Sequence, residues 1–254
     1  MGVTFPNESP EYRAARDQLL EAEIGLRRAM EAIAVARRAL PPGGLVPEDY
    51  VFDGLDAEGR PDKVRLFDLF KPGRDSVLIY NMMFPRHSAE QSGGASEGET
   101  AKLPVQAQPC PSCTALVDQF DAAAFHLKPA GCDRAIVAKA PIEQLAALAR
   151  DRGWKNVRLL SSAGNSFNRD YHAEDADGEQ EPLMSVFHRD ADGIRHFWSS
   201  ELGFAEMEPG QDPRAMGLLE PLWNMIDLTP EGRPDWNVEL AYDRDREEEQ
   251  GRAA

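Results

Sequence analysis

The segment CPSCTALVDQFDAAAFHL runs from Cys110 to Leu127 and opens with two cysteines that are two residues apart. Its apolar residues recur at helical spacing, so we predict a helix that begins at the dithiol and ends near Leu127. A helix N-terminus offers unpaired N–H groups and the positive end of the helix dipole, and both favour a thiolate. The spacing also lets the two sulfurs close a disulfide. We therefore predict a redox dithiol in which Cys110 is the exposed attacking thiol and Cys113 resolves the mixed disulfide.

The segments around this helix have the order of a thioredoxin-like fold. The stretch SVLIYNMMF, Ser76–Phe84, is apolar almost throughout, as expected for a strand buried on both faces of a sheet. After the helix, a strand, a second helix and another strand indicate a βαβ unit, and a hairpin follows. The predicted fold class is α/β, a thioredoxin-like mixed sheet with flanking helices, in which these later elements are Arg134–Ala140, Pro141–Arg152, Val157–Ser161, Met184–Arg189 and Ile194–Ser199.

A long helix is expected before this domain. Ser9 is a good N-cap, Pro10 suits the first helical position, and no strong breaker occurs before Pro41. Leucine or isoleucine recurs every seven residues, with alanines between, which predicts a narrow seam that packs on its own domain or on a second copy in a homodimer. We expect three regions: a helical arm over residues 1–44, the thioredoxin-like domain over residues 45–205, and a C-terminal extension over residues 206–254, with a broken helix near Pro221 and a frayed acidic tail.

The composition indicates which classes of partner the chain does not bind and in which compartment it occurs. The chain has 28 Lys and Arg against 44 Asp and Glu, a formal charge of −16, which opposes binding to nucleic acid or to an anionic membrane surface. We find no membrane-spanning apolar run and no secretory signal, and three cysteines do not make a secreted disulfide framework. We therefore expect a cytoplasmic protein, in which a disulfide is transient and catalytic.

A CxxC pair is also half of a metal site, so a second interpretation stays open. Met82, Met83 and His87 precede the dithiol closely, and thioether, thiolate and imidazole groups suit copper(I). In this alternative Cys110, Cys113 and His87 hold copper or another soft metal. No second CxxC follows, and neither a P-loop nor a GxGxxG is present, so the first interpretation needs no cofactor. A third alternative is a non-catalytic interaction module.

Some other residues near the dithiol have a structural and a functional interpretation. Cys132 is expected to be a structural thiol rather than a resolving one. Asp118 and Asp121 are expected on a solvated helix face, with a proton acceptor for the resolving thiol as the alternative. The segment His87–Pro109 is predicted to be a long surface loop, and we hypothesise that it covers the site and restricts access to Cys110.

Short motifs along most of the chain also carry a family resemblance. They are EYRAARDQLLEAEIGLRR at Glu11–Arg28, ALPPGG at Ala39–Gly44, DYVFDG at Asp49–Gly54, LIYNMMF at Leu78–Phe84, CPSC at Cys110–Cys113, VAKAPIEQL at Val137–Leu145, GW at Gly153–Trp154, SVFHRD at Ser185–Asp190 and DLTPEGR at Asp227–Arg233. On these motifs the chain resembles the DUF899 family of bacterial thioredoxin-like proteins. The resemblance implies a thioredoxin-like or peroxiredoxin-like fold with an N-terminal helix, and it implies no particular reaction.

Three positions depart from what the resemblance implies. Asn81 stands where the family tends to have His, and the link from Pro85 to Pro109 is longer than the family's. Pro182 is offset from the place where thioredoxins have a cis-proline facing the dithiol. Together the observations predict a thiol–disulfide oxidoreductase whose partner is a protein disulfide, a small-molecule disulfide or a peroxide.

Overall fold

The computed structural model describes residues 3–127 and 133–242. The chain divides into two compact units, residues 1–43 and residues 44–254. Cys132 and the tail from Asp243 onward lie outside the described residues, and so do the predictions made for them. No helix in the described part of the chain is long and apolar enough to cross a membrane.

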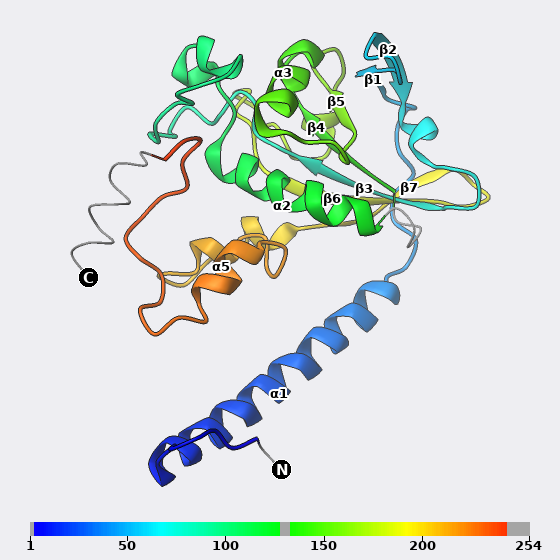
Figure 1. The fold of residues 1–254 in the computed structure, drawn as a ribbon. Coiled ribbons are helices and arrows are strands. Elements are labelled where there is room, and N and C mark those ends of the chain that lie inside the picture. Colours follow the sequence, from blue (N-terminus) through cyan, green and yellow to red (C-terminus); the bar gives the residue numbers. More distant parts are fainter. Residues whose placement is uncertain (1–2, 128–132, 243–254) are drawn as a thin grey trace. The chain divides into compact units, whose positions relative to one another are not determined.

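The first unit consists mainly of helix α1, Pro10–Arg38 (Figure 1). The predicted start is confirmed, because Ser9 Oγ accepts a hydrogen bond from Tyr12 N at 3.1 Å and Pro10 occupies the first turn. Arg37 and Arg38 in the last turn suit the negative end of the helix dipole. None of the helix side chains is buried within this unit, so its Leu/Ala seam is exposed there. That this seam packs on its own domain or on a second copy of the chain stays a prediction.

The second unit is built on one seven-stranded mixed sheet with the strand order β2-β1-β5-β4-β3-β6-β7. Strands β3, β4 and β5 are parallel, and the other pairings are antiparallel. The strands are β1 Val51–Leu55, β2 Pro61–Arg65, β3 Ser76–Asn81, β4 Asp133–Ala138, β5 Leu159–Ser161, β6 Leu183–Arg189 and β7 Ile194–Ser199. The helices are α2 Pro111–Leu127, α3 Ile142–Arg152, α4 Phe167–Asp170 and α5 Pro221–Ile226, with short 3₁₀ turns at Leu66–Leu69, Thr100–Lys102, Val105–Ala107, Glu201–Phe204 and Asp212–Arg214.

This arrangement confirms the predicted fold class. Helix α2 connects the parallel neighbours β3 and β4, helix α3 connects β4 and β5, and the hairpin of β6 and β7 lies on the other side of β3. Gly153 ends α3 in the left-handed conformation, at φ 73°, as its position in the sequence indicated. Strand β2 and helix α4 were not expected from the sequence, because each is short and carries no clear periodic pattern.

Strand β3 is apolar over most of its length because each of its faces contacts a different hydrophobic core. Val77 and Ile79 belong to a core that is rich in aromatic side chains from β1, α4 and β6. Tyr80, with Met82 just beyond the strand, belongs to a second core together with both cysteines and the apolar residues of α2 and α3. Successive side chains of a strand point to opposite faces, which accounts for this division. The strand therefore places Tyr80 on the same face as the dithiol helix.

The two outer edges of the sheet differ. Along β7, Val46 N donates to Ile194 O at 2.9 Å and His196 N donates to Gly44 O at 3.0 Å, so residues 44–46 run beside this strand. At the other edge, β2 is five residues long and begins with Pro61. One edge is therefore covered by a preceding segment, and the other is formed by a short strand.

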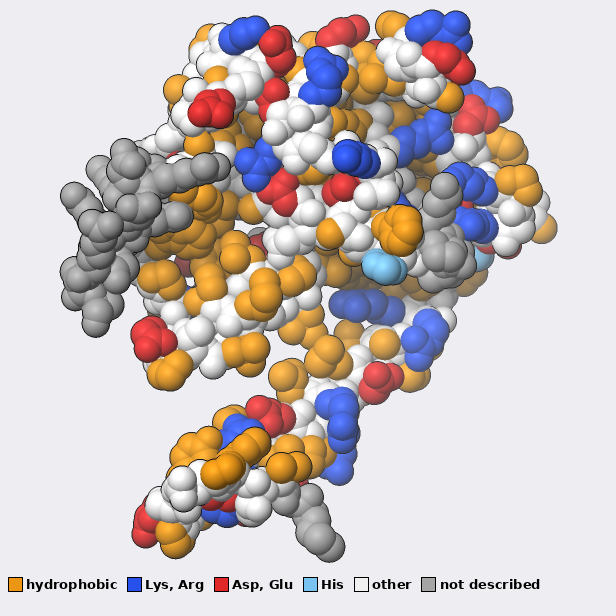
Figure 2. All heavy atoms as spheres, in the orientation of Figure 1, with side chains coloured by type: hydrophobic (Ala, Val, Ile, Leu, Met, Phe, Trp, Pro, Cys, Tyr) orange, Lys and Arg blue, Asp and Glu red, His pale blue; other side chains and the backbone are white. Residues whose placement is uncertain are grey.

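Residues after β7 have little regular structure within the described range. Helix α5 lies within the segment where a broken helix near Pro221 was predicted. Figure 2 shows hydrophobic side chains gathered around this part of the second unit. These residues contribute to the surroundings of the dithiol.

Candidate functional site

The two cysteines lie at the start of α2, as predicted. The helix begins at Pro111, so Cys110 is the residue just before it and Cys113 lies within its first turn. Backbone hydrogen bonds fix Cys110: its N–H donates to Met83 O at 2.9 Å, and its carbonyl accepts from Thr114 N at 3.0 Å. Both cysteines are free thiols. The segment just after β3 and helix α2 thus hold the pair in one place.

The expectation that Cys110 is exposed is wrong. Its exposed fraction is 1%, and that of Cys113 is 2%. The loop before the dithiol is closed on itself by Arg86, whose guanidinium donates to Pro109 O at 3.1 Å and to Ser92 O at 2.9 Å. A small open cavity at Ser112 of the dithiol turn is lined by residues 90–92 of this loop, by Trp223 and by residues 237–239 of the C-terminal segment. Parts of the chain that the local sequence does not indicate therefore border the dithiol turn at Ser112.

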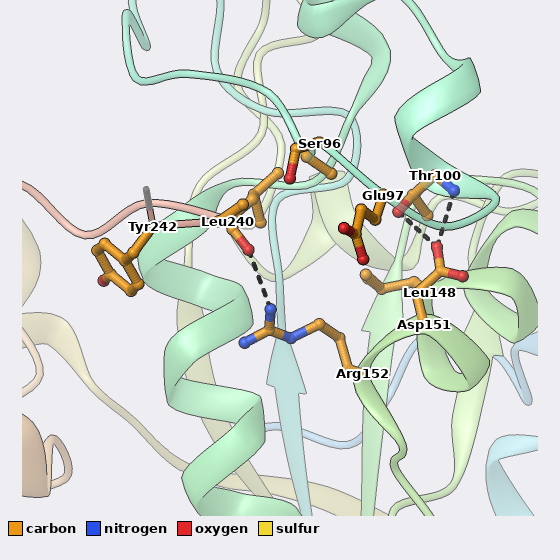
Figure 3. Close-up of a pocket in the computed structure, with 10 residues that line it drawn as sticks. Ser96, Glu97, Thr100, Leu148, Asp151, Arg152, Leu240 and Tyr242 are labelled. Carbon is orange, nitrogen blue, oxygen red and sulfur yellow. Dashed lines mark hydrogen bonds between the residues drawn. The ribbon is translucent and has the colours of Figure 1, made fainter. Parts of the chain in front are cut away.

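Both of these segments are tied to the end of α3, and Figure 3 shows the contacts. The carboxylate of Asp151 accepts hydrogen bonds from Thr100 N at 2.8 Å and Thr100 Oγ1 at 2.7 Å, which holds the loop. The neighbouring Arg152 donates to Leu240 O at 3.1 Å, which holds the C-terminal segment. A cavity of about 740 Å³ lies between the two anchors. One turn of α3 therefore anchors both segments that border the dithiol.

The two thiols differ in their ease of ionisation. A hydrogen bond from the Cys113 thiol, helped by backbone N–H groups of Cys113 and Ser112, lowers the pKa of Cys110 against the effect of burial. The interaction with Cys110 and burial both raise the pKa of Cys113. Cys113 also accepts hydrogen bonds from the Tyr80 hydroxyl and from Met83 N, the latter at 3.5 Å. Cys110 is therefore the thiol that ionises first, and Cys113 keeps its proton.

His87 does not lie with the cysteines in a metal site. Its Nε2 is 3.9 Å from a carboxylate oxygen of Glu179, and its Nδ1 accepts a hydrogen bond from Ala89 N at 3.0 Å. Within the described ranges, no group of three or more His, Cys, Asp or Glu side chains is placed to hold a metal ion. Met82 is fully buried in the core. The geometry thus gives the soft-metal alternative of Cys110, Cys113 and His87 no support.

The two carboxylates of α2 lie on a partly exposed face and have structural contacts. Asp118 accepts a hydrogen bond from the indole Nε1 of Trp154 at 2.7 Å and pairs with Arg152. Asp121 accepts three backbone N–H bonds from the turn that leads into β5, at 2.6 to 3.0 Å. Each carboxylate therefore ties α2 to the end of α3 or to the segment after it.

Replacing Asp121 by alanine is expected to lower the free energy of unfolding by about 1–3 kcal/mol, because three N–H groups lose their acceptor. Urea unfolding of the two proteins measures the difference. Asp121→Asn keeps one acceptor oxygen and should lose less. Glu143→Ala, an exposed change on α3, is the control and should stay within about 0.5 kcal/mol. A loss no larger for Asp121→Ala than for this control would contradict the capping role.

Sequence reasoning missed a cavity of about 490 Å³ that reaches the dithiol turn at Ser112 and Cys113. Tyr80 and Glu220 also line it, and neither was a candidate. Tyr80 was hidden in an apolar strand, and Glu220 lies in a segment without a motif, so no local signal marked them. Pro182, which the sequence showed to be offset from the thioredoxin cis-proline, does not follow a cis peptide bond; among the described residues the cis bond lies at Phe84–Pro85.

Comparison with solved structures gives several similar proteins. Peroxidoxin BcpB from Mycobacterium tuberculosis is 17% identical with a TM-score of 0.39, covering 71% of this chain and 96% of that chain. AhpC from Enterococcus faecalis is 12% identical with a TM-score of 0.43, covering 76% and 97%. A cysteine-to-serine mutant of PrxQ from Xylella fastidiosa is 8% identical with a TM-score of 0.44, covering 73% and 97%.

No curated protein sequence matches this chain. One family model does, described as a bacterial protein of unknown function, DUF899, and its match extends over residues 3–248. This range includes α1, the whole sheet and the dithiol. Because the match covers nearly the entire sequence, the chain belongs to the DUF899 family.

Proposed function

We propose that this protein is a thiol–disulfide oxidoreductase that works through Cys110 and Cys113. The observation that carries the proposal is the hydrogen-bonded dithiol at the start of α2, in which one thiol is favoured as thiolate and the other as thiol. The thiolate is the nucleophile in disulfide exchange, so the lowered pKa assigns the attack to Cys110. In this proposal the neighbouring protonated thiol, Cys113, finishes the reaction.

The reaction proceeds in two exchanges. The Cys110 thiolate attacks one sulfur of a substrate disulfide, forms a mixed disulfide and releases the other half as a thiolate, which takes up a proton. Cys113 then loses its proton and attacks Cys110 Sγ, which releases the second half and leaves a Cys110–Cys113 disulfide. The substrate gains two electrons and the dithiol loses two. A hydroperoxide would convert Cys110 to a sulfenic acid with loss of an alcohol, and Cys113 would then displace water.

A thiol count before and after oxidation tests this proposal. The Cys132→Ser variant leaves the dithiol as its only cysteines. We expect two titratable thiols in the denatured reduced protein, none after treatment with a small disulfide, and two again after reduction. The oxidised protein should be two mass units lighter and monomeric on a non-reducing gel. A protein that keeps both thiols, or that forms only cross-linked chains, would refute the proposal.

The pH dependence of alkylation reports the thiolate of Cys110. Because hydrogen bonding lowers its pKa, the rate should reach its plateau at a lower pH than for an ordinary cysteine, whose pKa is about 8.5. Cys113→Ala removes the largest donor and should raise the pH midpoint. Cys113→Ser keeps a hydroxyl donor and should raise it less. Iodoacetamide labelling between pH 5 and 10, a range chosen around that value, measures these midpoints. A midpoint for Cys113→Ala equal to that of the parent protein would show that the Cys113 side chain does not stabilise the thiolate.

A further inference from the structure

The cavity of about 490 Å³ beside the dithiol is bordered by two parts of the second unit. Tyr80, Met83, Ser112 and Cys113 form the wall on the side of β3 and α2. Much of the remaining wall comes from residues 203–237, between β7 and the end of the described chain. A cavity of this size holds a small molecule rather than a folded protein. Of the two cysteines, Cys113 lines this cavity and Cys110 is its hydrogen-bonded neighbour, so a low-molecular-mass compound in the cavity approaches the dithiol from the Cys113 side.

Aromatic side chains give this cavity an apolar body. Trp223 and Trp236 meet edge to face, with ring centroids 6.1 Å apart and planes at 65°. Phe204 and Tyr80 add two further rings. Indole and phenyl faces carry partial negative charge and attract organic cations as well as apolar groups. The wall therefore suits a compound that has an apolar or cationic organic group.

The charged residues of the wall favour the same kind of compound. Glu181, Asp212 and Glu220 contribute three carboxylates. The cation among the lining residues, Arg233, is already paired, since its guanidinium donates to the carboxylate of Asp227 at 2.7 and 2.6 Å. The cavity thus carries an excess of negative charge. Anions are repelled from it and cations are concentrated in it.

Glu220 is the carboxylate that connects the wall to the dithiol. It is half-buried, its side chain is hydrogen-bonded to that of Trp223, and it acts electrostatically on Tyr80. Tyr80 in turn donates to Cys113. One wall residue therefore joins the aromatic pair to the dithiol. An ammonium group placed beside Glu220 and Trp223 has both a carboxylate and an indole face as partners.

We propose that this cavity is the substrate site and that it selects small organic disulfides carrying amino groups. This inference rests on the proposed dithiol function, and it adds the substrate class. The walls exclude a folded protein from direct contact through this route, and the carboxylates disfavour acidic disulfides. The aromatic pair holds the organic part, and Glu220 holds the ammonium group.

Three disulfides of similar size test the selection: cystamine with two ammonium groups, neutral bis(2-hydroxyethyl) disulfide, and anionic 3,3′-dithiodipropionate. The measurement is the second-order rate constant for oxidation of the reduced Cys132→Ser protein at low ionic strength. Electrostatic focusing changes such rates by about 10-fold to 1000-fold. We expect cystamine to react at least about tenfold faster than the neutral compound, and the anionic compound to be slowest.

Two matched variants distinguish the effect of the cavity on the rates from the effect of the protein's overall negative charge. Glu220→Gln should reduce the ratio of the cystamine rate to the neutral rate by about threefold or more, as expected for a lost carboxylate partner in a partly buried site. Glu143→Gln removes the same charge from an exposed position on α3 and should leave the ratio unchanged. An equal or reversed order of the three compounds, or equal effects of the two variants, would overturn the substrate class while leaving the dithiol function intact. Failure of all three compounds to oxidise the dithiol would refute the dithiol function itself.

Discussion

Replacing Cys110 by serine is expected to reduce the rate of disulfide reduction by at least about a thousandfold, as loss of a catalytic nucleophile commonly does. A serine hydroxyl in this place is not ionised at neutral pH and cannot form a mixed disulfide. The measurement is steady-state reduction of a small disulfide by the protein with an excess of dithiothreitol, corrected for the uncatalysed reaction. The Cys132→Ser variant is the matched control and should retain the parent rate.

The Cys113→Ser variant distinguishes attack from resolution. If Cys110 attacks, this variant should accumulate one mixed disulfide per chain, visible as added mass that a reductant removes. Cys110→Ser should accumulate none. If Cys110→Ser instead retained more than about a tenth of the parent rate, or were itself the variant that trapped the substrate, the assignment of the nucleophile would be wrong.

Replacing Phe167 by alanine is expected to lower the free energy of unfolding by about 3–5 kcal/mol. This ring is fully buried in the core that is rich in aromatic side chains, and it has four aromatic neighbours. Their ring centroids lie 5.0 to 5.7 Å from that of Phe167, and they belong to Tyr50, Phe52, Tyr171 and Phe187. Removing the ring leaves a cavity that the surrounding rings cannot fill without losing their own contacts.

Urea unfolding followed by circular dichroism measures this loss. Phe125→Ala is the control, because the Phe125 ring on α2 is 67% exposed. Its replacement should change the stability by about 0.5 kcal/mol or less. A loss below about 1 kcal/mol for Phe167→Ala would mean that the aromatic core repacks around the space, contrary to the close packing of these rings.

The order of the main elements was predictable because the signals that specify them are local. Ser9 and Pro10 mark the start of α1 whatever the rest of the chain does. The run at Ser76–Phe84, apolar almost throughout, indicates burial on both faces, which a central strand provides. The CxxC at a helix start follows from the spacing of the apolar residues after it. Each of these features depends on a few neighbouring residues.

The surroundings of the dithiol were not predictable, because they are made by contacts between distant segments. Cys110 was expected to be exposed, yet the loop before it and residues 237–239 lie beside its turn. Nothing in the sequence near Asp151 indicates that this carboxylate holds Thr100. Glu220 also lines the cavity, and the broken helix predicted near Pro221 gave no sign of which part of the molecule it would contact. Sequence patterns identify elements better than they identify which loops meet.

The two edges of the sheet have a consequence for how this protein behaves at high concentration. An exposed edge strand offers free N–H and C=O groups on which another chain can add a strand, a common first step in aggregation. Residues 44–46 already pair with β7, so that edge presents fewer free groups. The opposite strand, β2, is short and has the sequence PDKVR, whose proline and charges discourage such pairing. The sheet is thereby protected against growing from one molecule to the next, and self-association, where it occurs, is directed to other surfaces.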